Sequence, residues 1–140
     1  MSALTVTAAK VSADQTQGSI VRNYELAAEM TLGTLVSLDS SGKLTKAQAD
    51  GTAAEARAIG ILVAGPYLMG GTTIASGQRG SVCTFGPVYG FSGMTPGAVG
   101  WVSDTAGEIE TAPSTTNTIA AGRAWAADVF FVNIGVSDYS

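Results

Sequence analysis

Side chains that commonly carry catalysis are scarce in this chain of 140 residues. There is no histidine, so an imidazole base and histidine metal ligands are both excluded. The one cysteine, Cys83, lies between Val82 and Thr84 and has no histidine to activate it. We therefore expect Cys83 to be a buried small side chain that forms no disulfide, and we expect no metal and no cofactor.

Two aspartates are the remaining candidates for acid–base chemistry. Asp39 and Asp104 occupy equivalent places in two similar segments. A catalytic carboxylate pair needs raised pKa values in a shared pocket, whereas an aspartate at the first position of a turn bonds back to its own backbone. We interpret both as turn residues and expect no enzyme. A small β-barrel enzyme that uses these two carboxylates is the competing hypothesis.

The stretch GFSGMTPGAVGWVSDTAGEI at 90–109 is the segment most like a ligand-binding loop. However, the nucleotide-binding patterns GxGxxG and GxxxxGK[ST] are both absent, and no helical pattern follows to offer its N-terminus to a phosphate. We therefore interpret these glycines as the corners of a β-sheet protein.

The glycines recur because the chain contains a repeat. MTLGTLVSLDSSGKLT at 30–45 and MTPGAVGWVSDTAGEIET at 94–111 share Met-Thr-x-Gly followed by Asp-x-x-Gly. The second copy has one extra residue, which we interpret as a β-bulge. A weaker match continues from 58–61 to 121–124. The predicted structural turn residues are Gly33, Asp39, Gly42, Gly97, Asp104 and Gly107.

Short apolar runs separated by turn signals predict an all-β fold, a small sandwich or barrel built from two similar hairpin-containing units with an N-terminal arm. We assign residues 1–20 to the arm and 21–140 to a single β-rich domain, with the internal repeat at approximately 30–86 and 94–135. The segment 46–58 is the most favourable for helix, but Gly51 within it limits the expectation to a short helix or a loop.

The surface is expected to be weakly charged. Charged residues make up 13% of the chain, about half the usual share, and the net charge is −4. Such surfaces associate readily, whereas nothing basic is available to follow a phosphate backbone, so we expect no direct nucleic-acid contact. The apolar stretch AIGILVAGPYLMGG is broken by glycines and Pro66, and we expect no membrane span.

The N-terminal arm and the aromatic residues are the candidate contact surfaces. Leu4 and Val6 alternate with polar residues, which fits either a frayed terminus or an arm that pairs with a neighbouring subunit. For Trp101 and Phe131 we expect core positions, whereas Tyr89 and the nearby Phe91 flank a bend that we expect to be exposed. The candidate interface residues are Leu4, Val6, Val11, Tyr89 and Phe91.

Two quoted segments carry a resemblance to a known family. GPVYGFSGMTPGAVGWVSDTAGEIETAP and MTLGTLVSLDSSGKLT resemble the small β-rich bacteriophage proteins that decorate or cement capsids, of the head-decoration and head-fibre types. The matching motifs fall at Gly93 to Thr111 and Ala121 to Ala124, and the likeness extends over residues 26–135. Met94 and Trp101 stand where leucine and tyrosine are more usual.

The resemblance implies a structural virion protein on the outer surface of a phage capsid, made in the cytoplasm of the bacterial host. It would be a homo-oligomer, with a trimer favoured, that clamps neighbouring major capsid proteins, and residues 1–20 would be its contact. The alternative is another virion component, such as a fibre or tail module, in which Tyr89, Phe91 and Trp101 stack on a glycan or receptor.

Overall fold

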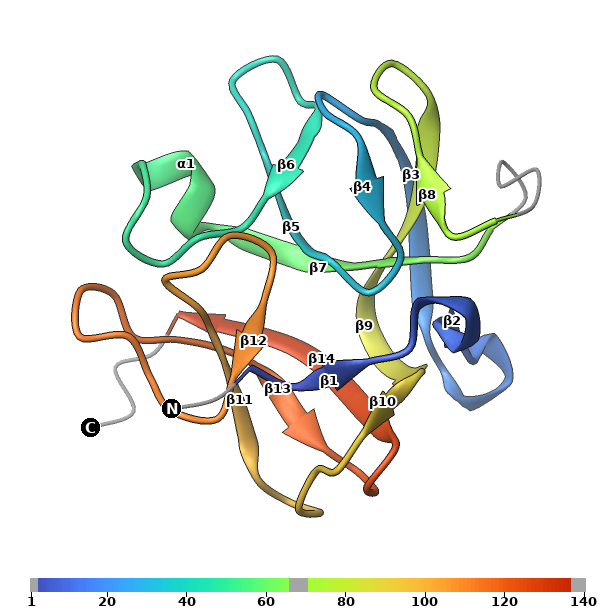
Figure 1. Ribbon diagram of the computed structural model, residues 1–140, viewed down its shortest axis with the longest axis vertical. Helices are drawn as coiled ribbons and strands as arrows, with labels where there is room; N and C mark the ends of the chain where they lie inside the picture. The colour runs from blue at the N-terminus through green and yellow to red at the C-terminus, as the bar shows by residue number, and fades with distance from the viewer. Residues whose placement is uncertain (1–2, 66–70, 137–140) are drawn as a thin grey trace.

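The computed structural model describes residues 3–65 and 71–136, and the chain is all-β with short helical turns. One curled antiparallel sheet forms a half-barrel (Figure 1). Its strand order is β12-β11-β13-β14-β9-β7-β5-β6, and β2 and β3 also pair with β9. The small pairs β1-β10 and β4-β8 lie apart from this sheet.

The sheet strands are β2 (Ser12–Ala13), β3 (Ile20–Glu25), β5 (Leu35–Leu38), β6 (Leu44–Lys46), β7 (Ala58–Val63), β9 (Arg79–Tyr89), β11 (Val99–Val102), β12 (Ile109–Glu110), β13 (Ile119–Ala124) and β14 (Val129–Val136). The other elements are β1 (Thr5–Val6), β4 (Met30–Thr31), β8 (Thr73–Ile74), β10 (Phe91–Ser92), α1 (Ala53–Ala56) and two 3₁₀ turns, η1 (Ala8–Lys10) and η2 (Gln15–Gln17).

Strand β9 joins the two halves of the sheet. Its first half pairs with β3 on one edge and with β7 on the other, and its second half pairs with β2 and β14. Pro87 lies where the edge partner changes from β3 to β2, so its missing N–H interrupts no ladder on that edge. The carbonyl of Pro87 accepts bonds from the Ser19 hydroxyl and the Asp14 amide instead.

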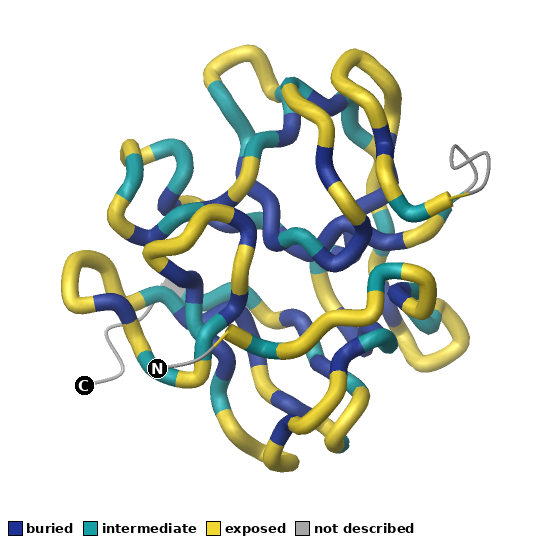
Figure 2. Tube along the Cα trace, in the orientation of Figure 1, coloured by how far each residue is buried: buried dark blue, intermediate teal, exposed yellow. Residues whose placement is uncertain are grey.

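The core fills the inside of the curl (Figure 2). Apolar side chains alternate with outward positions along β14, where Phe130 and Val132 are buried while Asn133 is exposed. Met30 and Met94, the first residues of the two repeat motifs, are both buried in this core. Cys83 is buried too, and burial raises the pKa of its thiol.

The first Met-Thr-x-Gly motif is a turn that docks on β7. The Thr34 amide donates to the Thr31 carbonyl at 3.3 Å, and the Gly33 amide donates to the Leu62 carbonyl at 2.8 Å. The Leu62 amide returns a bond to the Thr34 carbonyl at 2.9 Å. The third residue of the turn, Gly33, has φ +93°, which favours glycine there.

The second motif makes the same bonds to β13. The Ala98 amide donates to Thr95 at 3.0 Å, Gly97 donates to the Ala124 carbonyl at 2.7 Å, and Ala124 returns a bond to Ala98 at 2.9 Å. Pro96 occupies the second position of this turn, where its fixed φ suits a type II geometry. The chain therefore has two similar units, as the sequence predicts.

The two hairpins differ in one detail that corrects the sequence alignment. In the first, Asp39 Oδ1 accepts the Ser41 amide at 2.8 Å and the Lys43 amide at 2.9 Å, as predicted for a turn aspartate. In the second, Ser103 takes that place, because its hydroxyl accepts the Thr105 amide at 2.8 Å. Asp104 is the extra loop residue, and its carboxylate accepts the Ser114 hydroxyl at 2.7 Å.

The extra residue is therefore in the hairpin loop and is not a bulge. The register pairs Leu38 with Leu44 in one hairpin and Val102 with Ile109 in the other, so the second loop is longer by one residue. Both units also carry a register shift within the sheet. It follows Val36 in the pairing of β5 with β7, and it follows Gly100, the matching residue, in the pairing of β11 with β13.

The weaker part of the predicted repeat is shifted by one residue. Gly60 pairs with Val36, and Gly122 pairs with Gly100 in the equivalent place, so 58–61 corresponds to 120–123 and not to 121–124. Both glycines are forced by close backbone: a Cβ at either would run into a carbonyl oxygen of the next strand. Four residues of the segment 46–58 form the short helix α1, which begins with a capping box between Thr52 and Glu55.

Replacing the matched turn glycines separates backbone strain from contact with the arm. Gly97→Ala places a side chain at φ +87° with open space around it, and we expect a cost of about 1–2 kcal/mol. Gly33→Ala adds a collision with Val6 and Val11, so it should cost more. Urea unfolding of both variants measures the difference.

The control for this comparison is Val6→Ala. In the Gly33→Ala background it should remove the extra loss of unfolding free energy that the collision causes. In the Gly97→Ala background it should leave the loss of unfolding free energy unchanged. If Gly33→Ala and Gly97→Ala lower the free energy of unfolding by the same amount, the assigned contact between the Gly33 turn and the arm is contradicted.

Candidate functional site

The N-terminal segment crosses the front of the molecule between the two units (Figure 1). Strand β1 pairs with β10, through Thr5 with Ser92 and Val6 with Phe91. Next to it the Leu4 amide donates to the Ile109 carbonyl at 2.8 Å, in the second unit. Val6 packs over Gly33, in the first unit, so the arm bridges both.

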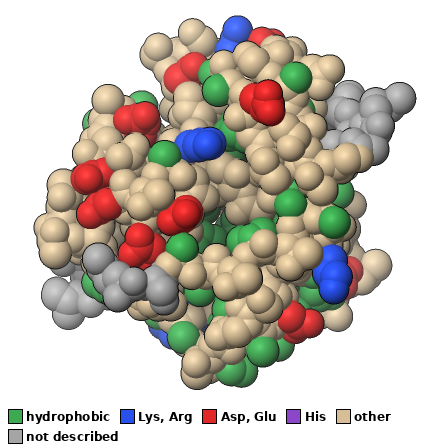
Figure 3. Space-filling model, in the orientation of Figure 1, with side chains coloured by type: hydrophobic (Ala, Val, Ile, Leu, Met, Phe, Trp, Pro, Cys, Tyr) green, Lys and Arg blue, Asp and Glu red, His purple; other side chains and the backbone are tan. Residues whose placement is uncertain are grey.

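A hollow of about 230 Å³ lies beside the arm on this face. It is lined by Leu4, Val6, Leu32, Gly33, Thr34, Phe91, Gly107, Glu108 and Ile109. Figure 3 shows this front face, with a hollow near its centre and acidic side chains spread over its left part. The arm therefore offers an apolar edge on a face that carries negative charge.

The predicted interface residues divide into exposed and buried ones. Val6 is 37% exposed and Leu4 is partly buried. Val11 and Phe91 belong to the core at 2% and 3% exposure, because Phe91 packs on the ring of Phe130 with centroids 5.6 Å apart. Neither side chain is available to a partner in this fold, whereas the contact through Leu4 and Val6 stays a prediction.

Tyr89 is half-buried and holds the second half of the arm in place. Its hydroxyl donates to Asp14 Oδ2 at 2.6 Å. Asp14 Oδ1 also accepts the amide and hydroxyl of Thr16. The bonds from Thr16 and then from Tyr89 lower the pKa of Asp14, and the same carboxylate raises the pKa of Tyr89.

The candidate catalytic groups do not come together. Asp39 bonds within its own hairpin loop, Asp104 accepts the Ser114 hydroxyl from the connection between β12 and β13, and Cys83 Sγ lies 3.4 Å from the Phe85 carbonyl oxygen inside the sheet. Within residues 3–65 and 71–136 no group of histidine, cysteine or acidic side chains is arranged to hold a metal. In the same residues no helix is long and apolar enough to cross a bilayer.

The outer face of the sheet carries an aromatic cluster that was not predicted. Trp125 and Phe85 are 49% and 41% exposed, and the half-buried Phe131 lies between them. The Trp125 ring stacks on Phe131 with centroids 4.6 Å apart and an angle of 18°, and Phe131 meets Phe85 edge-on at 5.0 Å. Ile20, 47% exposed, pairs with Phe85 and extends this apolar strip.

The prediction that Phe131 lies in the core was wrong, and the sequence itself contains a pattern that indicates its outward position. Consecutive residues of a strand point to opposite faces, so Phe130 and Phe131 cannot both face the inside. Phe130 is 1% exposed, and Phe131 faces out. Trp101, the other residue expected in the core, is half-buried.

A second hollow, of about 320 Å³, adjoins this cluster. It is lined by Gly97, Val99, Ala120, Gly122, Arg123, Ala124, Trp125, Phe131 and Asn133. Arg123 Nη1 donates to the Gly97 carbonyl at 3.2 Å, which fixes the guanidinium at the rim. One aromatic wall, a floor of small residues and two polar side chains make this hollow a candidate for binding a small ligand.

The bond between Tyr89 and Asp14 predicts a pH-dependent contribution to stability. A lowered carboxyl pKa stabilises the fold above pH 3.8, the ordinary value, and this contribution is lost as the pH falls through the lowered value. The raised pKa of Tyr89 stabilises below pH 10 and is lost as the pH rises through the raised value. Tyr89→Phe should therefore lower Tm at neutral pH. The difference in Tm between the variant and the parent protein should become smaller at both acidic and alkaline pH.

Tyr24→Phe is the matched control for this measurement. Tyr24 is also half-buried and, in the described part of the chain, has no carboxylate partner. Its Tm difference from the parent protein should stay constant with pH. A Tyr89→Phe difference equally constant from pH 2 to 11 would contradict the role of the Asp14 bond.

Comparison with known proteins identifies no relative, so these candidate sites are interpreted from their geometry alone. No protein-family model matches the chain, and no curated protein matches its sequence.

Proposed function

We propose that this protein is a structural component of a bacteriophage virion that binds the outer surface of the capsid and stabilises it. The turn motifs at 30–45 and 94–111 support the proposal through their resemblance to capsid decoration proteins. In this proposal the protein acts by adhesion, as a homotrimer that contacts neighbouring major capsid proteins. It performs no catalysis.

The observation that carries the proposal is the arm on the front face. The first part of the arm is extended, β1 pairs with β10 over two residues, and Val6 remains 37% exposed. Extended segments with exposed apolar side chains can add contacts to a neighbouring sheet or surface without disturbing the domain beneath. Leu4 and Val6 are thus the proposed centre of the capsid contact, with Glu108 beside them in the lining of the hollow.

Capsid binding can be tested with a pair of exposed residues on opposite faces. Val6→Lys should weaken co-sedimentation of the purified protein with heads of its phage by about tenfold or more, since a charge replaces an apolar contact. Ile20→Lys is the control, because Ile20 is 47% exposed on the outer face of the sheet. Absence of the protein from purified virions, or equal loss in both variants, would overturn the proposal.

The proposed trimer has its own measurement. Light scattering on the full chain should give three times the mass of one chain, 14.1 kDa. Val6→Lys then reports whether the arm also holds subunits together, through a shift towards the monomer mass. A full chain that stays monomeric both in solution and on heads would contradict the trimer.

A further inference from the structure

We propose that the hollow beside Trp125 is a binding site for an acidic carbohydrate, a short saccharide that carries a carboxylate. The site is formed by Trp125, Phe131, Arg123 and Asn133 above a floor of small residues. It lies on the outer face of the sheet, away from the arm, so this inference is independent of the proposed capsid contact.

The aromatic wall of the hollow is held in place before any ligand arrives. Phe131 stacks on one face of the Trp125 indole, and Phe85 supports Phe131 edge-on. Trp125 is nevertheless 49% exposed, so its remaining face is open to solvent. A sugar ring presents a face of C–H groups with partial positive charge, which suits the negative face of an aromatic ring.

The floor of the hollow is formed by backbone and small residues. Gly122 has no side chain to offer it, because a Cβ there would meet the Phe131 carbonyl oxygen and the buried Phe130 ring. Gly97, Ala120 and Ala124 add little bulk around it. The resulting volume, about 320 Å³, is at the lower end of the range typical of small-ligand sites.

The two polar side chains select for hydroxyl groups and negative charge. One N–H group of Arg123 donates to the Gly97 carbonyl. Because a guanidinium has five N–H groups, others remain to donate to a carboxylate. Asn133 is exposed, and its amide can both donate to and accept from neighbouring hydroxyls. None of the residues lining the hollow is acidic.

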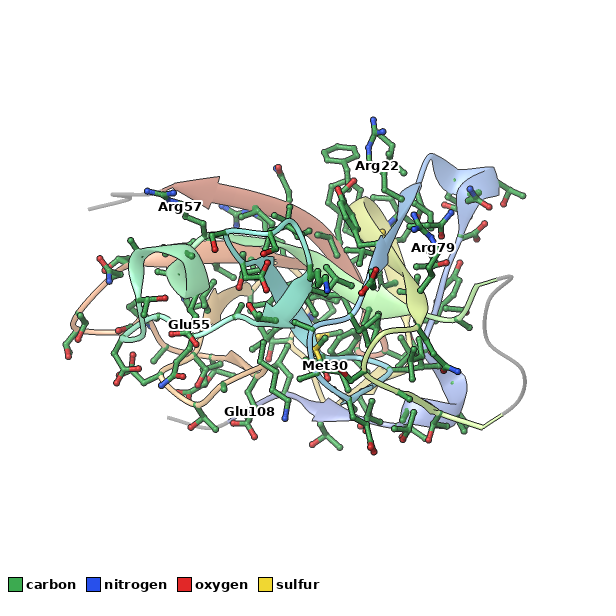
Figure 4. The ribbon with its side chains drawn as sticks, turned by 90° about the horizontal axis from the view of Figure 1, so that it is seen from above. Arg22, Met30, Glu55, Arg57, Arg79 and Glu108 are labelled. Atoms are coloured by element: carbon green, nitrogen blue, oxygen red, sulfur yellow. The ribbon has the colours of Figure 1, made fainter. Side chains whose placement is uncertain are left out.

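Two further arginines extend from the side of the sheet on which β14 lies. Figure 4 shows Arg22 and Arg57 pointing away from the sheet on the side where β14 lies, whereas Glu108 points to the opposite side. Arg123 is the charged residue in the lining of the hollow itself, so an anionic ligand meets a positive charge there although the net charge of the chain is −4. A flat apolar patch would fit any partner, but an aromatic wall beside an arginine and an amide fits an acidic sugar.

The test compares trigalacturonic acid with a neutral galactose trisaccharide by titration, followed by tryptophan fluorescence and by NMR. We expect the acidic trisaccharide to bind at least tenfold more tightly than the neutral one. Trp125→Ala should reduce both affinities about tenfold or more, and Trp125→Phe should restore part of the loss. Arg123→Gln should abolish the preference for the acidic sugar, and Asn133→Ala should weaken both.

Ile20→Ala is the matched control, since Ile20 is exposed to a similar extent but does not line the hollow, and its affinities should equal those of the parent protein. Three outcomes would overturn the proposal. They are no binding of either sugar at about 20 mM, a preference unchanged by Arg123→Gln, or an oligomer that dissociates on Trp125→Ala, which would make this face a protein contact. Retention of head binding by Trp125→Ala separates the result from that of the capsid proposal.

Discussion

Most of the architecture depends on the need of β9 to satisfy its backbone hydrogen bonds on both edges along eleven residues. No single neighbour is long enough to do so, so β3 and β2 share one edge while β7 and β14 share the other. Because β7 and β14 leave β9 from different halves, the two units diverge from a common strand. The sheet curls around the core that lies between them.

The divergence gives the molecule two different faces. On the front, the N-terminal arm bonds to the second unit through Leu4 and packs on the first through Val6, so it closes the gap that the diverging units leave. On the back, β9 and β14 run side by side, and their outward residues Phe85 and Phe131 meet. One face is therefore a bound arm with an acidic surround, and the other is an aromatic strip with arginines near it.

The repeat explains why so few charged or catalytic groups are needed. Each unit fixes its strand corner with the same three backbone hydrogen bonds from a Met-Thr-x-Gly turn. Backbone hydrogen bonds and apolar burial stabilise the fold, whereas the ion pair between Lys43 and Glu25 is exposed and contributes little. The copies differ at matched positions: Cys83 in the first unit, which is buried, corresponds to the half-buried Phe131 in the second.

The sequence by itself determined the fold class, the two hairpin units and the turn residues Gly33, Asp39, Gly42, Gly97 and Gly107, because turn chemistry is local and positive φ restricts the residue type. It placed Asp104 and the extra residue wrongly, since a loop of one more residue and a bulge look alike until the strand register is known. Only the tertiary structure decided that Val11 and Phe91 are buried and that Phe85, Phe131 and Trp125 meet. Those outcomes depend on which strands become neighbours. The shared strand β9 brings together residues that are far apart in the chain, and no local sequence pattern encodes that pairing.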